Sequence, residues 1–241
     1  MAALSSPVAF SSAFETSGED LDFILNALAH HNIRSLLPEA REEFYLRRGK
    51  PVPEDPFFDA YMTIFLEWFI IDRPFMNGVS PLRDFLTGRP TLEQSRNLSR
   101  HHLLMSHHSL FEVMTPWKKD FFWLRDLIYG DDWLVTHWPP FPGIDPGQPL
   151  ECRLVFSHER VTLTPGIVVY PFSARDAIHE LIAKLKDQMG LETIMDLIAK
   201  LTVRAFRYPK LSPKRFYSLE DPLTRDIAQQ VGLSPVKSDG A

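Results

Sequence analysis

The chain has 241 residues, of which 44% are apolar and 24% charged, so it has the composition of an ordinary globular protein with room for one large core or two small ones. Its one cysteine, Cys152, excludes an intramolecular disulfide framework and a multi-cysteine zinc site. The net charge of −5 is uneven, because residues 197–217 carry +6 and residues 218–241 carry −2, which leaves −9 on residues 1–196.

No targeting or membrane segment is recognisable. Residues 1–14 lack a secretory signal pattern, and the longest apolar run, Ile64–Ile71, is interrupted by Glu67 and is too short to span a bilayer. We therefore expect a cytoplasmic protein without a transmembrane segment.

The first elements are helical. Residues 1–18 are rich in Ser and Ala, and we expect a loose tail there. Apolar residues at helical spacing predict a helix over residues 19–31 and a second one from Pro38 to Arg48, which Gly49 ends.

An aromatic helix is predicted to follow the proline-rich connector 50–56. We expect Asp55 to cap its start, Pro56 to occupy the first helical position, and Pro74 to end it. Because this helix is apolar on most of its circumference, it should lie at the centre of the N-terminal half.

Two further helices are predicted from capping patterns. The first opens at Ser80 and ends at Gly88, and the second opens at Thr91 and reaches about Met105.

Beyond Met105 the hydrophobic period changes to that of β-strands. Tyr129–Asp132 and His158–Glu159 are predicted hairpin turns. Because five short twisted strands rarely stay flat, we expect a small, partly closed barrel. The predicted strands are Ser109–Thr115, Phe121–Leu127, Trp133–Trp138, Leu150–Ser157 and Val161–Tyr170.

Helix returns at Ser173, where another capping box opens a helix that Gly190 breaks. The next helix is predicted to end at Phe206, and Asp221 with Pro222 can begin a short last helix to Val231.

These elements predict an α+β fold with a helical N-terminal block, a small five-stranded antiparallel SH3- or OB-like barrel, and a helical C-terminal extension. The expected divisions are a loose tail (1–18), a helical block (19–108), the barrel (109–172), a helical extension (173–206), and a Pro-punctuated basic segment with a short terminal helix (207–241).

Four short motifs carry a resemblance to a known group of proteins: EWFIIDRP at Glu67–Pro74, SPLRDFL at Ser80–Leu86, SLFEV at Ser109–Val113 and LRDL at Leu124–Leu127. Over residues 55–172 the chain resembles uncharacterised bacterial cytoplasmic proteins in which a helical block precedes a small β-barrel, sometimes beside a SEC-C zinc motif. The resemblance implies the same order of helices and barrel here. It implies no catalytic residue, and one cysteine cannot supply a SEC-C motif.

Four histidines form the densest cluster of potential metal ligands: His101, His102, His107 and His108. Helical ligand pairs usually stand three or four residues apart, whereas these spacings are one, five, six and seven, with no carboxylate in between. We expect solvated or capping histidines at the end of a helix, and metal binding stays an open alternative.

Glu67 and Asp72 are acids within the most apolar helix, where a buried carboxyl can gain a raised pKa and an acid–base role. Five residues apart on a helix, however, they should point in different directions. An ion pair of Asp72 with Arg73 or Arg83, or a cap onto the following turn, is the simpler expectation.

Catalytic motifs are absent from the sequence. It has no Gly-rich phosphate loop, nucleophile elbow or zinc-protease helix, and Cys152 lies in a strand pattern typical of a passive thiol. The sequence therefore predicts no catalytic residue, no metal and no cofactor, while an enzyme site built from distant residues stays open.

The basic segment interleaves cations with aromatic rings, a mixture that can hold phosphates while it stacks on bases. It can equally dock on the protein's own acidic body or on a protein partner. Tryptophans near the predicted barrel can likewise face a partner, or the helices can cover them. The candidate partner-binding residues are Arg204, Arg207, Tyr208, Lys210, Lys214, Arg215, Phe216, Tyr217, Trp117, Trp133 and Trp138.

The leading hypothesis is a non-catalytic interaction protein that binds protein partners through the aromatic barrel surface and the basic C-terminal segment. The alternatives are a nucleic-acid-binding accessory protein that uses residues 204–217, and an enzyme with a dispersed site.

Overall fold

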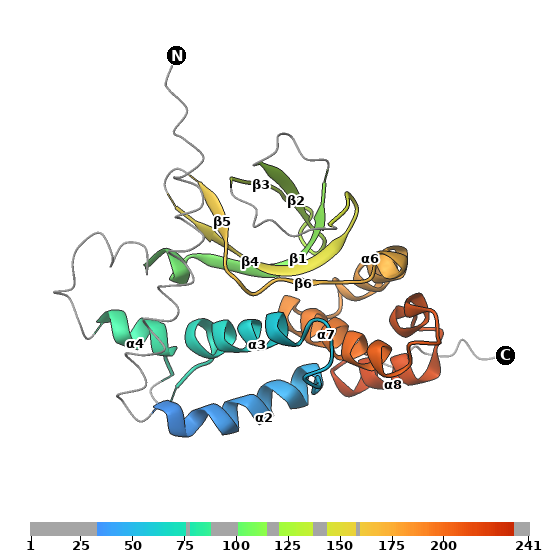
Figure 1. The fold of residues 1–241 in the computed structure, drawn as a ribbon, viewed down its shortest axis with the longest axis horizontal. Helices are drawn as coiled ribbons and strands as arrows, with labels where there is room; N and C mark the ends of the chain where they lie inside the picture. The colour runs from blue at the N-terminus through green and yellow to red at the C-terminus, as the bar shows by residue number, and fades with distance from the viewer. Residues whose placement is uncertain are drawn as a thin grey trace, which may run out of the picture.

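The computed structural model describes residues 33–75, 78–87, 101–114, 121–136, 144–157 and 160–233. The fold is α+β: N-terminal helices, a five-strand mixed β-barrel and C-terminal helices follow one another along the chain. Figure 1 shows the barrel above a helical layer that contains α2 (Leu37–Arg48), α3 (Phe58–Glu67) and α7 (Leu191–Arg207). Helices from both ends of the described chain thus share one layer.

The N-terminal helices follow the predicted order. The short 3-10 turn η1 (Ile33–Leu36) leads into α2, which ends at Gly49, as predicted, with a left-handed φ of +86° that glycine adopts without strain. The chain becomes extended at Arg73, before Pro74, also as predicted. The next helix, α4 (Pro81–Thr87), starts after Ser80.

The aromatic helix ends in a π-helical turn. After α3 the chain widens into η2 (Trp68–Asp72), where the Arg73 N–H donates to the Trp68 carbonyl five residues earlier, at 2.8 Å. Ile64, Phe65, Phe69 and Ile70 are buried, which confirms that this segment lies in the centre of its half.

Two predicted helix caps are wrong. The carboxylate of Asp55 does not cap α3; it accepts the Val52 N–H at 2.8 Å and pairs with Arg207 at 3.1 Å. Ser173 does not cap α6 (Arg175–Leu185), because the chain enters that helix through a 3-10 turn, η3 (Phe172–Ala174). In both places another tight turn precedes the helix and displaces the predicted cap from its first residue.

The other C-terminal predictions hold. Gly190 precedes α7, and after the 3-10 turn η4 (Pro213–Tyr217) Asp221 caps α8 (Pro222–Gln230) by accepting the Leu223 and Thr224 N–H groups. The predicted helix over 19–31, Gly88 and Thr91 lie outside the described residues, whereas residues 101–104 are helical.

Five strands close the barrel in the order β1, β2, β3, β5, β4 and back to β1. The predicted antiparallel barrel is wrong at one pair, since β3 and β5 run parallel with Val135 opposite Val161. A closed ring with an odd number of strands cannot alternate direction everywhere, so one parallel neighbour is unavoidable. The strands are β1 (Ser106–Val113), β2 (Phe122–Asp126), β3 (Asp132–Val135), β4 (Pro149–Phe156) and β5 (Val161–Leu163).

The last predicted strand is split. Pro165 and Gly166 interrupt it, so β5 ends at Leu163 and a separate β6 (Val168–Val169) pairs with β4, with Leu150 opposite Val169. The predicted turn between β2 and β3 is confirmed, with Gly130 at a φ of +84°. The second predicted turn, at 158–159, lies outside the described residues.

Apolar side chains form two clusters. One fills the barrel with residues such as Phe111, Leu124 and Leu163, and the other joins N- and C-terminal helices, for example Phe44 of α2 and Ile198 of α7. Among the described residues, no helix has the length and apolar character needed to cross a membrane.

Candidate functional site

A charged seam, which we define as Arg48, Glu67, Asp72, His108, Glu151 and Arg153, lies between the barrel and the helical layer. Four of these side chains are almost completely buried, with residue exposures of 3% or less for Arg48, Glu67, Glu151 and Arg153. Buried charges are costly unless they are paired, so their arrangement decides what this region can do.

Glu151 is the centre of one half of the seam. Arg48 Nη2 donates to both of its carboxylate oxygens at 2.6 Å, and the Tyr170 hydroxyl donates to it at 2.7 Å. The Nε2 atom of His108, on the adjacent β1, lies 2.8 Å from Glu151 Oε1. One buried carboxylate thus connects α2, β1 and the end of β6.

Arg153 is the centre of the other half. It stands two residues after Glu151 on β4 and so shares its face of the strand. Its Nη1 atom donates to Asp72 Oδ1 at 3.2 Å and to Ser106 Oγ at 3.0 Å, and its Nη2 atom also pairs with Asp72. Its Nε atom lies 3.7 Å from Glu67 Oε2.

The expectation that Glu67 and Asp72 point in different directions, with Asp72 paired to Arg73 or Arg83, is therefore wrong. On an α-helix two residues five apart are separated by about 140° around the axis. The π-helical turn from Trp68 to Asp72 has more residues per turn and brings both carboxylates to Arg153. Arg73 instead pairs with Glu43 at 2.8 Å.

The environment shifts the pKa values of this seam in opposite directions. Burial raises the pKa of Glu67 to about 7, against the opposing effects of Arg153 and of hydrogen bonds from Thr164 and Gly166. Burial would also raise the pKa of Glu151, but Arg48 and His108 outweigh it and bring that pKa to about 2. Burial lowers the pKa of His108, although Glu151 opposes this shift. The two buried glutamates of the seam thus differ, because the pKa of Glu151 lies far below neutral pH whereas that of Glu67 lies near it.

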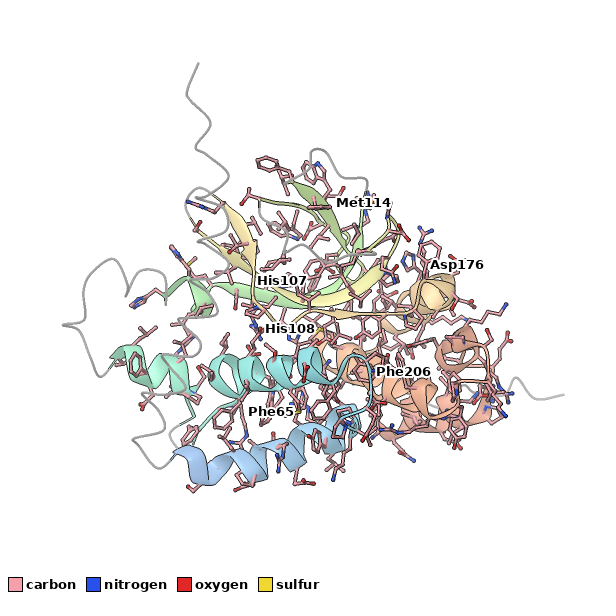
Figure 2. All side chains as sticks on the ribbon, viewed as in Figure 1. Phe65, His107, His108, Met114, Asp176 and Phe206 are labelled. Atoms are coloured by element: carbon pink, nitrogen blue, oxygen red, sulfur yellow. The ribbon has the colours of Figure 1, made fainter. Side chains whose placement is uncertain are left out.

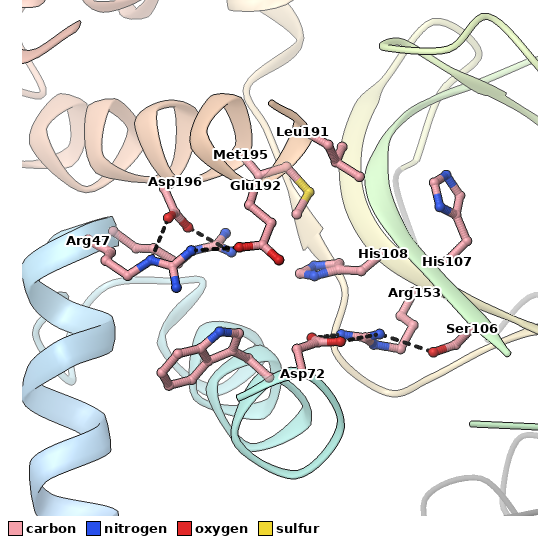
Figure 3. Close-up of a pocket in the computed structure, with 12 residues that line it drawn as sticks. Arg47, Asp72, Ser106, His107, His108, Arg153, Leu191, Glu192, Met195 and Asp196 are labelled. Carbon is pink, nitrogen blue, oxygen red and sulfur yellow. Dashed lines mark hydrogen bonds and ion pairs between the residues drawn. The ribbon is translucent and has the colours of Figure 1, made fainter. Parts of the chain in front are cut away.

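A pocket of about 200 Å³ opens beside the seam. Its walls come from both layers: Trp68 and Asp72 from η2, His108 from β1, and Glu192, Met195 and Asp196 from α7. Figure 3 shows His108 pointing into the gap between Glu192 and Asp72. Arg47 closes one side, with its Nε atom 2.7 Å from Asp196 and its Nη2 atom 3.1 Å from Glu192.

The predicted position of the histidines is corrected by the structure. His107 and His108 begin β1 instead of lying at a helix end, and Figure 2 shows both at the boundary between barrel and helices. His107 Nε2 lies 2.7 Å from Asp126, and His108 Nε2 lies 2.8 Å from Glu151. His101 and His102 belong to the helical residues 101–104 that precede the strand. Strand pairing with β4 outweighs the helical pattern that precedes them.

Within the described ranges, no group of three or more His, Cys, Asp or Glu side chains is placed to hold a metal ion. Cys152 is buried on β4, and burial raises its pKa well above the usual value for a thiol. The thiol of Cys152 is thus a protonated, buried side chain of the strand.

Several of the predicted partner-binding residues make contacts within the chain. Arg207 pairs with Asp55 at 3.1 Å, Arg215 pairs with Asp221 at 2.9 Å, and Arg204 lies 5.2 Å from the ring centroid of Phe216. Phe216 and Tyr217 are buried, and the Tyr217 hydroxyl lies 2.8 Å from Thr202 Oγ1.

The middle of the segment remains exposed. Tyr208 is 52% exposed and Leu211 41% exposed, and Lys210 and Lys214 lie on the surface beside them. Of the three candidate tryptophans, Trp133 is partly buried against Phe156, while Trp117 and Trp138 lie outside the described residues.

Comparison with protein-family models, curated proteins and solved structures finds no match for this chain. The resemblance to the SEC-C-associated proteins therefore stays a prediction.

Sequence reasoning missed the residues that organise the seam, above all Arg48, Glu151 and Arg153. A signal was present, because Glu151 and Arg153 are charges of opposite sign at alternate positions of an otherwise apolar strand. Such a pattern indicates a strand face that meets charged partners. The partners themselves come from residues about 80 to 100 positions away, as in the pairs of Arg153 with Asp72 and of Glu151 with Arg48.

Proposed function

We propose that this chain is a non-catalytic interaction protein whose basic C-terminal segment binds an acidic region of a partner protein. The observation that carries the proposal is the exposed stretch 208–214, which we call the basic turn. It presents Tyr208, Lys210, Leu211 and Lys214 and contains no acidic residue.

The basic turn projects from a fixed frame. On one side Arg207 is held by Asp55 and by the Lys50 carbonyl, each at 3.1 Å. On the other side Phe216 and Tyr217 are buried, and Arg215 is held by Asp221. A surface that is already ordered loses less conformational entropy when a partner binds, which favours recognition by this turn.

The chemistry of the turn defines the partner that suits it. Two lysines attract carboxylates and speed association, while Tyr208 and Leu211 offer apolar contact area. An acidic peptide with apolar residues between its carboxylates complements both features. A hollow of about 580 Å³ lies directly beside the turn, but its lining includes the acids Glu180, Glu220 and Asp221 as well as Lys214 and Arg215. We therefore expect the acidic peptide to contact the turn itself and not to fill this hollow.

The test is affinity purification from the native cell with charge-reversed variants. Lys210→Glu with Lys214→Glu should lose a partner that the unchanged protein retains. The matched control, Arg41→Glu with Arg83→Glu, makes the same change of charge at exposed positions of α2 and α4 and should keep it. Equal recovery from both double variants would refute the proposal, and the retained partner should dissociate as salt is raised.

We also propose that the aromatic surface of the barrel binds a protein partner. Among the described residues, the exposed Trp123 supports this part of the proposal. This side chain is 37% exposed on β2, whereas Trp133 on β3 is packed against Phe156. Exposed tryptophan on a sheet is a frequent anchor of protein interfaces.

A second candidate, nucleic-acid binding, is favoured by the outer face of β2. If the barrel is OB-like, as we propose for this candidate, nucleic acid would bind to the face of strands 2 and 3, which is where OB barrels bind oligonucleotides. Trp123 and Arg125 are both exposed on this face, and the Trp123 ring can stack on a base. Arg125 pairs with Asp132 at 2.8 and 3.0 Å, so it would have to exchange this partner to bind a phosphate. The segment 204–217, which the sequence predicts as the nucleic-acid site, has less support, because its rings Phe216 and Tyr217 are buried and cannot stack on bases.

A salt titration with single-stranded DNA separates the two locations. Trp123→Ala should weaken binding if the barrel stacks on bases, and Tyr208→Ala should weaken it if the basic turn does. A steep fall of affinity with salt is expected in either case. Absence of binding at low salt would exclude this candidate.

A further inference from the structure

The pocket beside the charged seam is lined by equal numbers of cationic and anionic side chains. They are three guanidinium groups and three carboxyl groups, those of Arg47, Arg48, Arg153, Asp72, Glu192 and Asp196. Glu67 and Glu151 also belong to the seam, but they are buried and do not line the pocket. A ligand with a net charge would disturb the balance of this partly buried lining, whereas a ligand that carries both charges would not.

The contact between Arg47 and Glu192 leaves one donor and one acceptor unused. Arg47 donates through Nε to Asp196 at 2.7 Å and through Nη2 to Glu192 Oε2 at 3.1 Å. Neither Arg47 Nη1 nor Glu192 Oε1 forms a hydrogen bond with another described residue. Both side chains are accessible, with 33% of Arg47 and 70% of Glu192 exposed, so a ligand can reach them.

The contact between Arg48 and Asp196 is similarly incomplete. Arg48 Nη1 lies 3.8 Å from Asp196 Oδ1, which is too far for a hydrogen bond. The Nε atoms of Arg48 and Arg153 are buried without a hydrogen-bond partner in the part of the chain that the structure describes. Pairing within the seam therefore does not use all the hydrogen-bonding capacity of its arginines.

The unused donors and acceptors are neighbours. Arg47 Nη1 and Glu192 Oε1 belong to two groups that already touch, and Arg48 Nη1 and Asp196 Oδ1 lie within 4 Å of each other. A ligand that uses both kinds of atom must therefore carry its negative and positive groups close together. An α-amino acid meets this condition, because its carboxylate and its ammonium group are attached to the same carbon.

The remaining walls of the pocket suit a short hydrocarbon chain. Trp68, Leu191 and Met195 supply apolar surface, and Figure 3 shows Met195 and Glu192 both pointing from α7 toward the gap. The volume of about 200 Å³ equals that of about six or seven waters in the liquid. This space accommodates an amino acid with a small side chain.

We propose that this pocket binds a small apolar α-amino acid as its zwitterion. The carboxylate would accept hydrogen bonds from Arg47 and Arg48, and the ammonium group would donate to Glu192. The hydrocarbon side chain would lie against Trp68 and Met195. This site is independent of the basic turn and adds small-molecule binding to the proposed interaction function.

The test is an NMR titration of the whole ¹⁵N-labelled chain at pH 7 with L-norvaline, pentanoate and n-butylammonium. These compounds share a hydrocarbon tail and carry both charges, the negative charge alone and the positive charge alone. Norvaline should bind with saturation at concentrations on the order of millimolar, and about two- to fivefold more tightly than either of the others. Absence of saturable norvaline binding, or equal binding of a compound with one charge, would overturn the proposal.

A fourth compound tests whether the two charges must be adjacent. The isomer of norvaline with its ammonium group at the far end of the chain, δ-aminopentanoate, carries the same two charges at a greater separation. It should bind more weakly than norvaline. Equal binding of the two isomers would refute the assignment to an α-amino acid.

Glu192 locates the ammonium end of the ligand. Glu192→Gln should weaken the binding of norvaline and butylammonium about two- to fivefold, the size expected for one exposed ion pair, and should not weaken that of pentanoate. Glu180→Gln on α6 is the matched control, because Glu180 is similarly exposed and also has one basic partner, Lys184. An equal norvaline affinity of the two variants would place the ligand elsewhere and contradict the assignment.

Arg47 locates the carboxylate end. Arg47→Lys keeps the positive charge but removes the unused Nη1 donor, so it should weaken the binding of norvaline and pentanoate and not that of butylammonium. Arg41→Lys, at an exposed position of the same helix, is the control and should bind all three compounds like the wild type. A loss of butylammonium binding equal to the loss of pentanoate binding in Arg47→Lys would argue against this orientation and overturn the proposed site.

Discussion

Glu67 makes the clearest prediction at the scale of a single residue. It is 1% exposed, and its two oxygens accept the Thr164 hydroxyl and the Gly166 N–H, each at 2.8 Å. Burial raises its pKa from 4.5 to about 7. The folded protein therefore holds this proton more tightly than the unfolded chain does.

The sign of the pH dependence follows from this difference. Between pH 4.5 and 7 the folded state carries more protons at Glu67 than the unfolded state, so the contribution to stability falls as pH rises. It is fully present below about pH 4.5 and is lost above about pH 7, with a total of up to about 3 kcal/mol. Glu67→Gln, which mimics the protonated form, should remove this slope.

The measurement is urea unfolding of the wild type and of Glu67→Gln between pH 5 and pH 8. The variant should gain stability relative to the wild type as pH rises, while the exposed Glu180→Gln should follow the wild type throughout. Parallel curves for the wild type and Glu67→Gln would show that Glu67 does not titrate in this range.

At the scale of secondary-structure elements, Gly166 lets the connection after β5 approach α3 closely. A Cβ atom at this position would lie 2.7 Å from Glu67 Oε1 and 2.9 Å from Ile64 Cγ1. Gly166→Ala should therefore lower the free energy of unfolding by about 1–3 kcal/mol, the usual cost of overpacking. Gly190→Ala is the control, because nothing lies within 4 Å of its added Cβ and its φ is −71°. Thermal unfolding that ranks the two variants equally would contradict this account.

Asp221 joins two elements. It caps α8 through the N–H groups of Leu223 and Thr224, and it pairs with Arg215 of η4 at 2.9 Å. Asp221→Ala should cost about 0.5–2 kcal/mol from the lost cap. It should also increase amide hydrogen exchange in residues 213–217. Asp226→Ala, an exposed change in the middle of α8, is expected to do neither.

Elements with local signals could be predicted from the sequence. Gly49 ends α2 with a positive φ that favours glycine. Gly190 precedes α7 at an ordinary φ of −71°, and Asp221 followed by Pro222 begins α8, because caps depend on the nearest few residues. Asp55 and Ser173 are also typical N-cap residues, but neither caps its predicted helix. An additional turn lies between each of them and the first residue of that helix.

Features that depend on distant residues could not be predicted. The π-helical turn at Trp68–Asp72 brings Glu67 and Asp72 to Arg153, which lies more than 80 positions away. The assignment of His107 and His108 to a strand depends on pairing with β4, and the parallel β3–β5 pair depends on closure of the whole ring. The candidate pocket consists of such features, so it escaped the sequence analysis.

At the scale of the whole molecule, the barrel and the helical layer meet through ion pairs as well as through apolar packing. Val155, Val168 and Tyr170 extend the helical core onto the barrel, and between them Glu151 and Arg153 pair with Arg48 and Asp72. Partly exposed pairs add little to stability, but removing one member of a buried pair leaves an uncompensated charge. The seam should therefore make the two layers unfold together.

This coupling can be measured with Arg48 and Glu151. Glu151→Gln leaves the Arg48 guanidinium buried without its carboxylate and should cost about 3–5 kcal/mol, and Arg48→Met should cost a similar amount by leaving Glu151 unpaired. The double variant removes both charges, so its loss should be clearly smaller than the sum of the two single losses. Additive losses would mean that the pair does not act as a unit.

The same variants test whether the seam makes unfolding cooperative. In the wild type, tryptophan fluorescence, to which Trp123 and Trp133 of the barrel contribute, and far-UV circular dichroism of the helices should report one coincident urea transition. In Glu151→Gln the two probes should separate, because the apolar clusters of barrel and helices remain intact while the charged contact between them is lost. Coincident transitions in this variant would mean that apolar contacts such as Val155 and Val168 suffice to couple the layers, and the seam would then serve the pocket more than the fold.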